Sequence, residues 1–399
     1  MTRKRNLFVG TGFVAAALAL GVGQYLLEQR ASAQAKTAVQ APRFEVDPMW
    51  PKPLPNHWLY GNVIGVGVDG RDHVFIIHRG EGNLNPKEIY ATANPPAAEC
   101  CNVAPPILEF DPDGNMVKAW GGPGQGFEWP ESNHGITPDS KGNLWIGGNG
   151  ANDGHILKFT RDGKFVKQFG FAYASAGSND MWAFNKVAKI SLDESANEAY
   201  VADGYGNHRV AVIDMDTGKI KRYWGAYANK PDDTNLGRYN PTAPPAQQFR
   251  NPVHCAVPSN DGLVYVCDRP NDRIQVFTKD GKFQKEAIVA KTTLGDGSVW
   301  DIAFSRDPQQ KYFYLADGAN EKIRVFDRQS LAELTTFGDG GRYPGAFYAV
   351  HSIATDSKGN IYTTETYEGK RVQKFVYKGL APVTKKDQGV VWPTKTTSH

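Results

Sequence analysis

Residues 132–170 have the sequence SNHGITPDSKGNLWIGGNGANDGHILKFTRDGKFVKQFG. A short apolar strand meets the turn Asp139–Asn143, and an aromatic-rich strand follows. A third strand then ends in Lys158-Phe159, and the turn Arg161–Lys164 leads into a fourth. Gly-Asn and Asp-Gly turns between short apolar runs predict antiparallel hairpins. Because one four-stranded unit cannot bury both of its faces, the segment predicts neighbours built in the same way.

The unit recurs along nearly the whole chain. A first copy, residues 62–122, is interrupted by an insertion at about 82–105, and four further copies follow residues 132–170, at 182–225, 249–289, 298–338 and 347–379. Six copies of this length predict an all-β fold, a six-bladed β-propeller. The last copy lacks a fourth strand, which we expect Arg43–Val46 to supply. The propeller is therefore expected over 43–379, with a C-terminal tail at 380–399.

The N-terminus has the composition of an export signal. Three basic residues, Arg3 to Arg5, precede an apolar run from Leu7 to Gly23 and a stretch of small residues at 31–35. Residues 1–35 are predicted to be a signal peptide or an uncleaved N-terminal anchor. We expect an exported protein, periplasmic or secreted, whose only membrane contact would be this segment.

The net charge and the cysteine content indicate which partners the protein can bind and whether disulfides can form. The net charge is +3 with scattered Lys and Arg, which argues against nucleic acid as a partner. Four cysteines in an exported chain permit two disulfides. Cys255 and Cys267 flank the turn 259–262 and are either paired across a hairpin or two buried thiols. The adjacent Cys100 and Cys101 form a vicinal disulfide, two thiols or a redox element.

Three of the nine histidines share one register. The start of the innermost strand in successive copies is aligned at Gly65, His134, Ala188, His254, Trp300 and His351. Equivalent positions on alternate blades of a six-fold ring form a near-equilateral triangle around the channel. Three imidazoles around one open position are the ligand set of a catalytic zinc. A single histidine at such a place is more often a hydrogen-bonded core residue, but the shared register favours a metal site.

Further candidates lie where the second strands end, at the same mouth of the channel. Arg79 and Arg269 have the bidentate geometry that suits a substrate carboxylate, or else they form salt bridges between blades. Tyr205, in the turn 203–207, is either a packed ring or a phenol that a nearby dication would help to ionise, and so a general base.

The repeats resemble NHL repeats, with their Asp-Gly-Asn turns and Ala-Asp-Gly strand ends. The candidate residues together resemble the peptidyl-α-hydroxyglycine α-amidating lyase family. The resemblance rests on five segments, which are Ile77–Gly80, Asn133–Ile136, Val201–Asn207, Pro252–His254 with Asp268-Arg269, and Val350–Ile353.

The resemblance implies a chemistry. Zinc on His134, His254 and His351 would hold the carbinol oxygen of the substrate, and Tyr205 would take its proton. Arg79 and Arg269 would hold the carboxylate and the developing charge. Cleavage of the C–N bond would then yield an amide and glyoxylate. The implied partner is a small-molecule or peptide-like substrate that carries a carboxylate.

The sequence departs from this family at several positions. Animal members have cysteine where this chain has Gly206, and their disulfide positions near Tyr265 and Val276 are not cysteine here, so we expect those cross-links to be absent. Ser352 replaces an aspartate that helps to hold a structural calcium in the family, which argues against calcium here. No segment of these 399 residues resembles a copper monooxygenase, so a related carbinolamide or another carboxylate substrate stays open.

Two other functions fit the same fold. A propeller lactonase or hydrolase would use a metal-activated water, but such propellers usually bind metal through carboxylates and Asn rather than histidine. A non-catalytic NHL binding platform could hold a purely structural metal. The additional presence of Tyr205 and both arginines argues against a mere scaffold.

Overall fold

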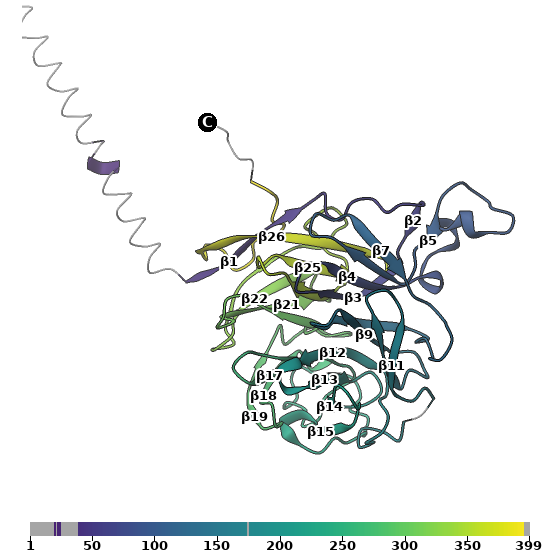
Figure 1. Ribbon diagram of the computed structural model, residues 1–399. Helices are drawn as coiled ribbons and strands as arrows, with labels where there is room; N and C mark the ends of the chain where they lie inside the picture. The colour runs from purple at the N-terminus through teal and green to yellow at the C-terminus, as the bar shows by residue number, and fades with distance from the viewer. Residues whose placement is uncertain (1–19, 21, 25–38, 174, 395–399) are drawn as a thin grey trace, which may run out of the picture.

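The computed structural model describes residues 20, 22–24, 39–173 and 175–394, which form six antiparallel four-stranded sheets and one short parallel pair (Figure 1). Blades one and two comprise β3 (Asn62–Val68), β4 (Val74–Arg79), β6 (Ile107–Phe110), β7 (Met116–Trp120), β8 (Asn133–Pro138), β9 (Asn143–Gly148), β10 (His155–Thr160) and β11 (Phe165–Gly170). Blades three and four comprise β12 (Val187–Asp193), β13 (Glu198–Asp203), β14 (Arg209–Asp214), β15 (Ile220–Trp224), β16 (Val253–Pro258), β17 (Leu263–Asp268), β18 (Arg273–Thr278) and β19 (Phe283–Ile288). Blades five and six comprise β20 (Asp301–Phe304), β21 (Tyr312–Asp317), β22 (Lys322–Asp327), β23 (Glu333–Phe337), β24 (Val350–Thr355), β25 (Ile361–Glu365), β26 (Arg371–Pro382) and β1 (Gln40–Asp47).

The blades close into a ring. Their innermost strands contact one another in cyclic order, from β3 through β8, β12, β16, β20 and β24 back to β3. Large apolar side chains fill the spaces between adjacent blades, as where Tyr314 and Phe337 of blade five meet Phe44 and Phe375 of blade six. The predicted six-bladed propeller is confirmed.

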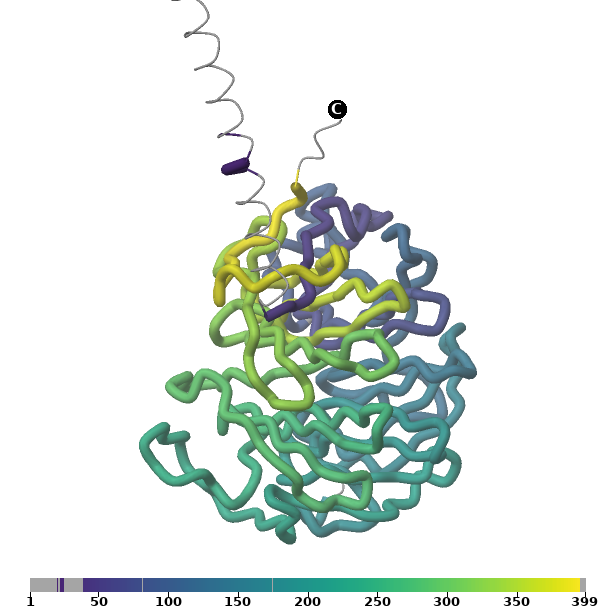
Figure 2. Tube along the Cα trace, turned by 90° about the vertical axis from the view of Figure 1, so that its left-hand side faces the viewer, coloured from purple at the N-terminus to yellow at the C-terminus, as the bar shows by residue number. Residues whose placement is uncertain are grey.

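Blade six is built from both ends of the chain. β1 pairs antiparallel with β26, so that Phe44 lies opposite Tyr377, and Figure 2 shows the purple and yellow segments side by side. The predicted closing strand is therefore present and is longer than Arg43–Val46. β26 extends to Pro382, and further along the chain Val391 O accepts from Val46 N at 2.8 Å. This pairing covers the outer edge of β26 and closes the ring within one blade.

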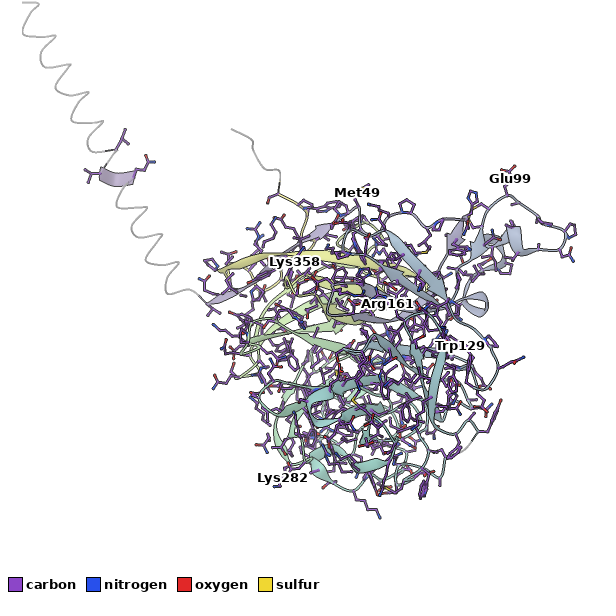
Figure 3. All side chains as sticks on the ribbon, viewed as in Figure 1. Met49, Glu99, Trp129, Arg161, Lys282 and Lys358 are labelled. Atoms are coloured by element: carbon purple, nitrogen blue, oxygen red, sulfur yellow. A yellow bond between two sulfur atoms is a disulfide. The ribbon has the colours of Figure 1, made fainter. Side chains whose placement is uncertain are left out.

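The insertion of blade one extends outward from the ring. It contains the short 3-10 helices η1 (Glu81–Asn83), η2 (Pro86–Glu88) and η3 (Tyr90–Thr92), and its strand β5 (Asn102–Val103) pairs in parallel with β2 (Trp58–Leu59). Glu99, labelled in Figure 3, lies on this projection. Three further 3-10 helices occur elsewhere, η4 (Glu194–Ala196), η5 (Ala226–Ala228) and η6 (Arg269–Asn271).

All four cysteines are paired. Cys255 and Cys267 face each other across β16 and β17 and form a disulfide, as one of the two sequence interpretations proposed. Cys100 and Cys101 form a vicinal disulfide in the insertion.

The predicted export signal falls outside the described residues, apart from Leu20 and Val22–Gln24. Within the part of the chain that is described, no helix is both long and apolar enough to span a membrane.

Candidate metal centre

Three histidines converge at one mouth of the channel. His134, His254 and His351 are each the second residue of an innermost strand, β8, β16 and β24, on alternate blades. Their ligand atoms lie within 4.8 Å of one another, and each residue is at most 2% exposed. The ring centroids are 4.9 Å apart for His134 and His351, 4.8 Å for His254 and His351, and 5.2 Å for His134 and His254. The structure thus brings together the three residues that the register analysis selected.

The register differs from the sequence alignment in blade one. The turns at Asp69 and Asp139 are equivalent, because each backbone N–H donates to the carbonyl four residues later. Val63 pairs with His78 in the way that Asn133 pairs with Gly148. The blade-one equivalent of His134 is therefore Ile64 rather than Gly65. The alignment of the first copy was therefore one residue out of register, although the same β-bulge occurs at this point in blades two, three, four and six.

Hydrogen bonds orient the three imidazoles. Nδ1 of His134 lies 2.6 Å from Ala188 O, and Nδ1 of His254 hydrogen-bonds to Trp300 O. Since a carbonyl only accepts, both Nδ1 atoms carry the proton and both Nε2 atoms carry a lone pair. His351 Nδ1 lies 3.2 Å from Ser352 Oγ, which itself donates to a backbone carbonyl and so accepts from the imidazole. This arrangement is the outer-sphere support typical of metal-binding histidines.

Burial keeps the imidazoles neutral. It is the largest cause that lowers the pKa of His134, His254 and His351 well below the ordinary histidine value, and the positive charge of Arg269 acts in the same direction on all three. A neutral imidazole is the form that binds a metal ion. Three neutral donors with their lone pairs at Nε2 fit a metal ion, and the set is compatible with zinc.

The Tyr205 hydroxyl lies against this cluster. Its oxygen is 3.0 Å from His134 Nε2 and 3.1 Å from His254 Nε2, and it accepts from Arg269 Nη1 at 3.3 Å. Burial raises the pKa of Tyr205, and the positive charges of Arg269 and Arg79 oppose that rise. The phenol therefore lies beside the point where the Nε2 atoms of His134 and His254 converge.

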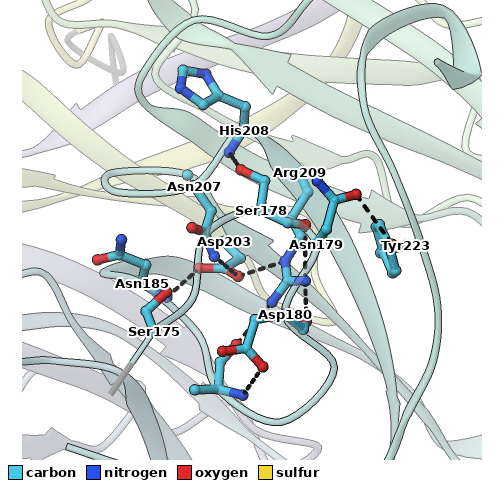
Figure 4. A network of polar contacts seen from close by, with 12 residues as sticks. Ser175, Ser178, Asn179, Asp180, Asn185, Asp203, Asn207, His208, Arg209 and Tyr223 are labelled. Carbon is cyan, nitrogen blue, oxygen red and sulfur yellow. Dashed lines mark hydrogen bonds and ion pairs between the residues drawn. The ribbon is translucent and has the colours of Figure 1, made fainter. Parts of the chain in front are cut away.

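The backbone places Tyr205 by a close approach between blades. A Cβ at Gly204 would lie 2.1 Å from Val253 O, so only glycine lets the turn lie against the strand that carries His254. A buried ion pair at the start of this turn, drawn in Figure 4, also stabilises it. Arg209 Nε donates to Asp203 Oδ2 at 2.8 Å. Asn207 Nδ2 donates to the same oxygen at 2.8 Å.

The two arginines have different surroundings. Arg79 Nε donates to Asn133 O at 3.2 Å, and its Nη2 donates to Asn149 Oδ1 at 2.7 Å. Among the described residues Arg79 forms no ion pair with a carboxylate, which leaves its charge available to a ligand. Arg269 is paired with Asp296, since its Nη2 lies 3.2 Å from Asp296 Oδ1.

Several residues at the site were not selected from the sequence. Asn133 and Asn149 hold Arg79, Ser352 orients His351, and the Trp300 ring lies 4.0 Å below the Arg269 guanidinium. Trp300 is one of the six aligned positions, so the sequence predicted that it faces the channel, but it was not chosen as a functional residue. The partners of Arg79 and Arg269 come from other blades or from loops, and no local pattern marks them.

A buried histidine beside the site gives a pH prediction. His78 Nε2 donates to Pro105 O at 2.9 Å, its Nδ1 accepts from Gly61 N, and burial lowers its pKa to about 4. Between pH 6.5 and 4 the unfolded chain binds the extra proton, so stability falls as the pH falls. From pH 7 to pH 5 this group alone should cost about 2 kcal/mol of unfolding free energy.

The test is urea unfolding of the metal-free protein at both pH values. The variant His78→Gln should show a smaller loss of stability between pH 7 and pH 5 than the wild type. His57→Gln changes an exposed histidine and serves as the control. An unchanged pH dependence in His78→Gln would contradict the assignment.

Comparisons with known proteins agree with the fold and the motifs. No known protein-family model matches the chain. Peptidyl-glycine alpha-amidating monooxygenase B of Xenopus laevis is 28% identical over 236 residues, which are 57% of this chain and 24% of that protein. NHL repeat-containing protein 3 of Mus musculus is 25% identical over 358 residues, 85% of each chain. Among solved structures, a streptogramin B lyase covers 85% of this chain and 98% of its own, with a TM-score of 0.50 and 13% identity.

These comparisons show which proteins the chain is related to and how much of their length it matches. The chain is homologous to the amidating monooxygenases and to NHL repeat proteins, as the motif resemblance predicted. It spans about a quarter of the length of the amidating monooxygenases that it matches. The streptogramin B lyase supports the propeller fold alone.

Proposed function

We propose that this protein is a zinc-dependent carbon–nitrogen lyase that splits a carbinolamide bearing a carboxylate into an amide and glyoxylate. The observation that carries the proposal is the meeting of three neutral Nε2 atoms with the hydroxyl of Tyr205, which lies 3.0 Å from His134 and 3.1 Å from His254. A zinc ion on these ligands would polarise the carbinol oxygen of the substrate and favour the ionised form of the phenol.

Arg79 and Tyr205 have separate roles in the proposed reaction. Arg79, which forms no ion pair with a carboxylate in the described part of the chain, binds the substrate carboxylate. Tyr205 in its ionised form takes the proton of the carbinol hydroxyl. As the C–O bond becomes a carbonyl, the C–N bond breaks and its electron pair stays on nitrogen. The proton on Tyr205 then passes to this nitrogen, which gives a neutral amide and regenerates the phenolate.

Arg269 acts on the phenol. Its Nη1 donates to the Tyr205 oxygen at 3.3 Å, and its charge lowers the pKa of Tyr205 against the effect of burial. The guanidinium is only 6% exposed, so its charge is weakly screened by water. We assign two roles to Arg269. Its Nη1 stabilises negative charge on the phenol oxygen and on the reacting oxygen, and its Nη2, which faces Asp296, helps Arg79 to hold the substrate carboxylate.

We also infer that the protein works outside the cytosol. All four cysteines are in disulfides, and disulfides persist in oxidising compartments. The basic and apolar N-terminal segment supports the same inference.

The test combines metal analysis with one assay. We expect about one zinc per chain by elemental analysis of the purified protein, and release of glyoxylate and benzamide from α-hydroxyhippurate. Zinc without glyoxylate release would keep the metal site and reject this substrate class. A protein without bound metal, and unable to bind added zinc, would favour the NHL binding platform.

A further inference from the structure

A carboxylate of the protein itself lies where Arg269 was expected to meet a substrate. Asp296, in the turn between β19 and β20, places Oδ1 3.2 Å from Arg269 Nη2. The Asp296 side chain is 51% exposed, whereas that of Arg269 is 6% exposed. The pair therefore joins a fixed buried cation to an anion at the edge of solvent, where the attraction is weak.

A second residue, from another blade, also hydrogen-bonds to the Asp296 carboxylate. Tyr367, in the turn after β25, donates its hydroxyl to Asp296 Oδ2 at 3.0 Å. The two oxygens of Asp296 thus connect a turn of blade six to the arginine that follows the second strand of blade four. An incoming carboxylate would find the same two donors, a guanidinium and a phenol, in the same positions.

The arginine does not depend on the Asp296 side chain for its position. Arg269 Nε donates to the backbone carbonyl of Asp296 at 2.8 Å, and its guanidinium stacks 4.0 Å from the Trp300 ring. Its Nη1 is directed to Tyr205. When the Asp296 carboxylate leaves, these three contacts keep the guanidinium in place.

The surroundings of Asp296 give its side chain room to move aside. The side chain is half exposed, while the backbone of the turn lies directly against Arg269, because a Cβ at Gly297 would be 2.1 Å from Arg269 O. A pocket of about 670 Å³, lined by Arg238, Arg250 and Leu294 among others, adjoins Asp296 and Arg269 on the side of the 235–239 loop. The exposed Arg238 has no ion-pair partner among the described residues, so this pocket favours an anionic side chain.

We propose that Asp296 is an internal competitor for the substrate carboxylate, held by Arg269 and Tyr367, and that it determines specificity at this mouth. A ligand whose carboxylate replaces Asp296 regains the hydrogen bonds that the exchange breaks. A ligand without a carboxylate leaves Asp296 in place and gains nothing from Arg269. The inference rests on the proposed function only for the identity of the ligand as a small carboxylate.

The experiment measures binding of hippurate, an unreactive carboxylate, and of hippuramide, its uncharged counterpart, to the metal-loaded protein by titration calorimetry. Asp296→Ala should bind hippurate about fivefold more tightly than the wild type, the gain expected when an exposed competing ion pair is removed. Binding of hippuramide should not change. Tyr367→Phe removes the same hydrogen bond from Asp296 and from the carboxylate that replaces it, so it should change hippurate binding much less than Asp296→Ala.

The matched control is Asp113→Ala. Asp113 is an exposed aspartate in the turn between β6 and β7, at the opposite end of the blade from Arg79, since Val74 pairs with Phe110. It changes the net charge equally and should leave hippurate binding unaltered. An equal gain in this control would assign the effect to net charge and overturn the proposal.

Weaker or unchanged hippurate binding by Asp296→Ala would overturn the proposal, as would the absence of hippurate binding in both proteins. Glyoxylate release from α-hydroxyhippurate is measured separately. If glyoxylate is released but Asp296→Ala does not bind hippurate more tightly, the role of Asp296 is rejected and the lyase activity is supported. The fivefold gain without release rejects the lyase and keeps Asp296 as a competitor for carboxylates.

Discussion

His254→Ala is expected to lose bound metal and lyase activity together. His254 is fully inside the site, 2% exposed, with its Nδ1 bonded to Trp300 O and its Nε2 directed to the cluster. Removal of a partner that only supports a ligand costs ten- to a hundredfold in metal affinity, so loss of the ligand itself should cost more than about a hundredfold. Zinc content after dialysis and glyoxylate release report the two effects.

The control separates metal binding from folding. His155→Gln changes another buried histidine, in β10, whose Nε2 donates to Glu128 O at 2.7 Å. This variant should keep its zinc. His351→Ala should reproduce the result of His254→Ala, and a circular dichroism spectrum like that of the wild type should accompany both. Retention of zinc by a folded His254→Ala protein would refute the three-histidine site.

Tyr205→Phe is expected to keep the metal and lose activity. The substitution removes only the hydroxyl, which lies 3.0 Å from His134 and 3.1 Å from His254, and leaves all three imidazoles in place. Loss of a general base typically lowers the rate by a hundredfold to ten-thousandfold. We expect kcat for α-hydroxyhippurate to fall by that factor while zinc content stays at the wild-type level.

A second tyrosine provides the matched control. Tyr223→Phe also removes one phenol hydroxyl, which donates to Asn179 Oδ1 at 3.2 Å (Figure 4) and, in the described part of the chain, forms no hydrogen bond with His134, His254 or His351. It should leave kcat unchanged. If Tyr205→Phe turned over α-hydroxyhippurate at the wild-type rate, another residue would have to accept the proton.

Local sequence patterns predicted the fold because a propeller repeats one local unit. Each copy carries its own strands and hairpin turns, so the number of blades could be counted before any tertiary contact was known. The closing strand at Arg43–Val46 followed from the missing fourth strand of the last copy. The structure confirms both, with β1 paired to β26 in blade six.

The three histidines could be chosen from the sequence for the same reason. Positions that share a register in repeated blades share a place in the ring, so His134, His254 and His351 had to face one channel. The one register error was Gly65 in place of Ile64, which stands at the same distance before its turn residue Asp69 as His134 does before Asp139. An alignment counted back from the turn of each copy would therefore have selected Ile64 without any tertiary contact.

The sequence by itself determined the propeller, the closure of blade six and the residues that converge at the channel, because all of these follow from a local repeat. Only the tertiary structure decided how the charges at the mouth are paired. Among the residues that the structure describes, it left Arg79 without a carboxylate partner and paired Arg269 with Asp296, which also accepts from Tyr367. These contacts join turns of different blades, and the packing of the closed ring brings such turns together.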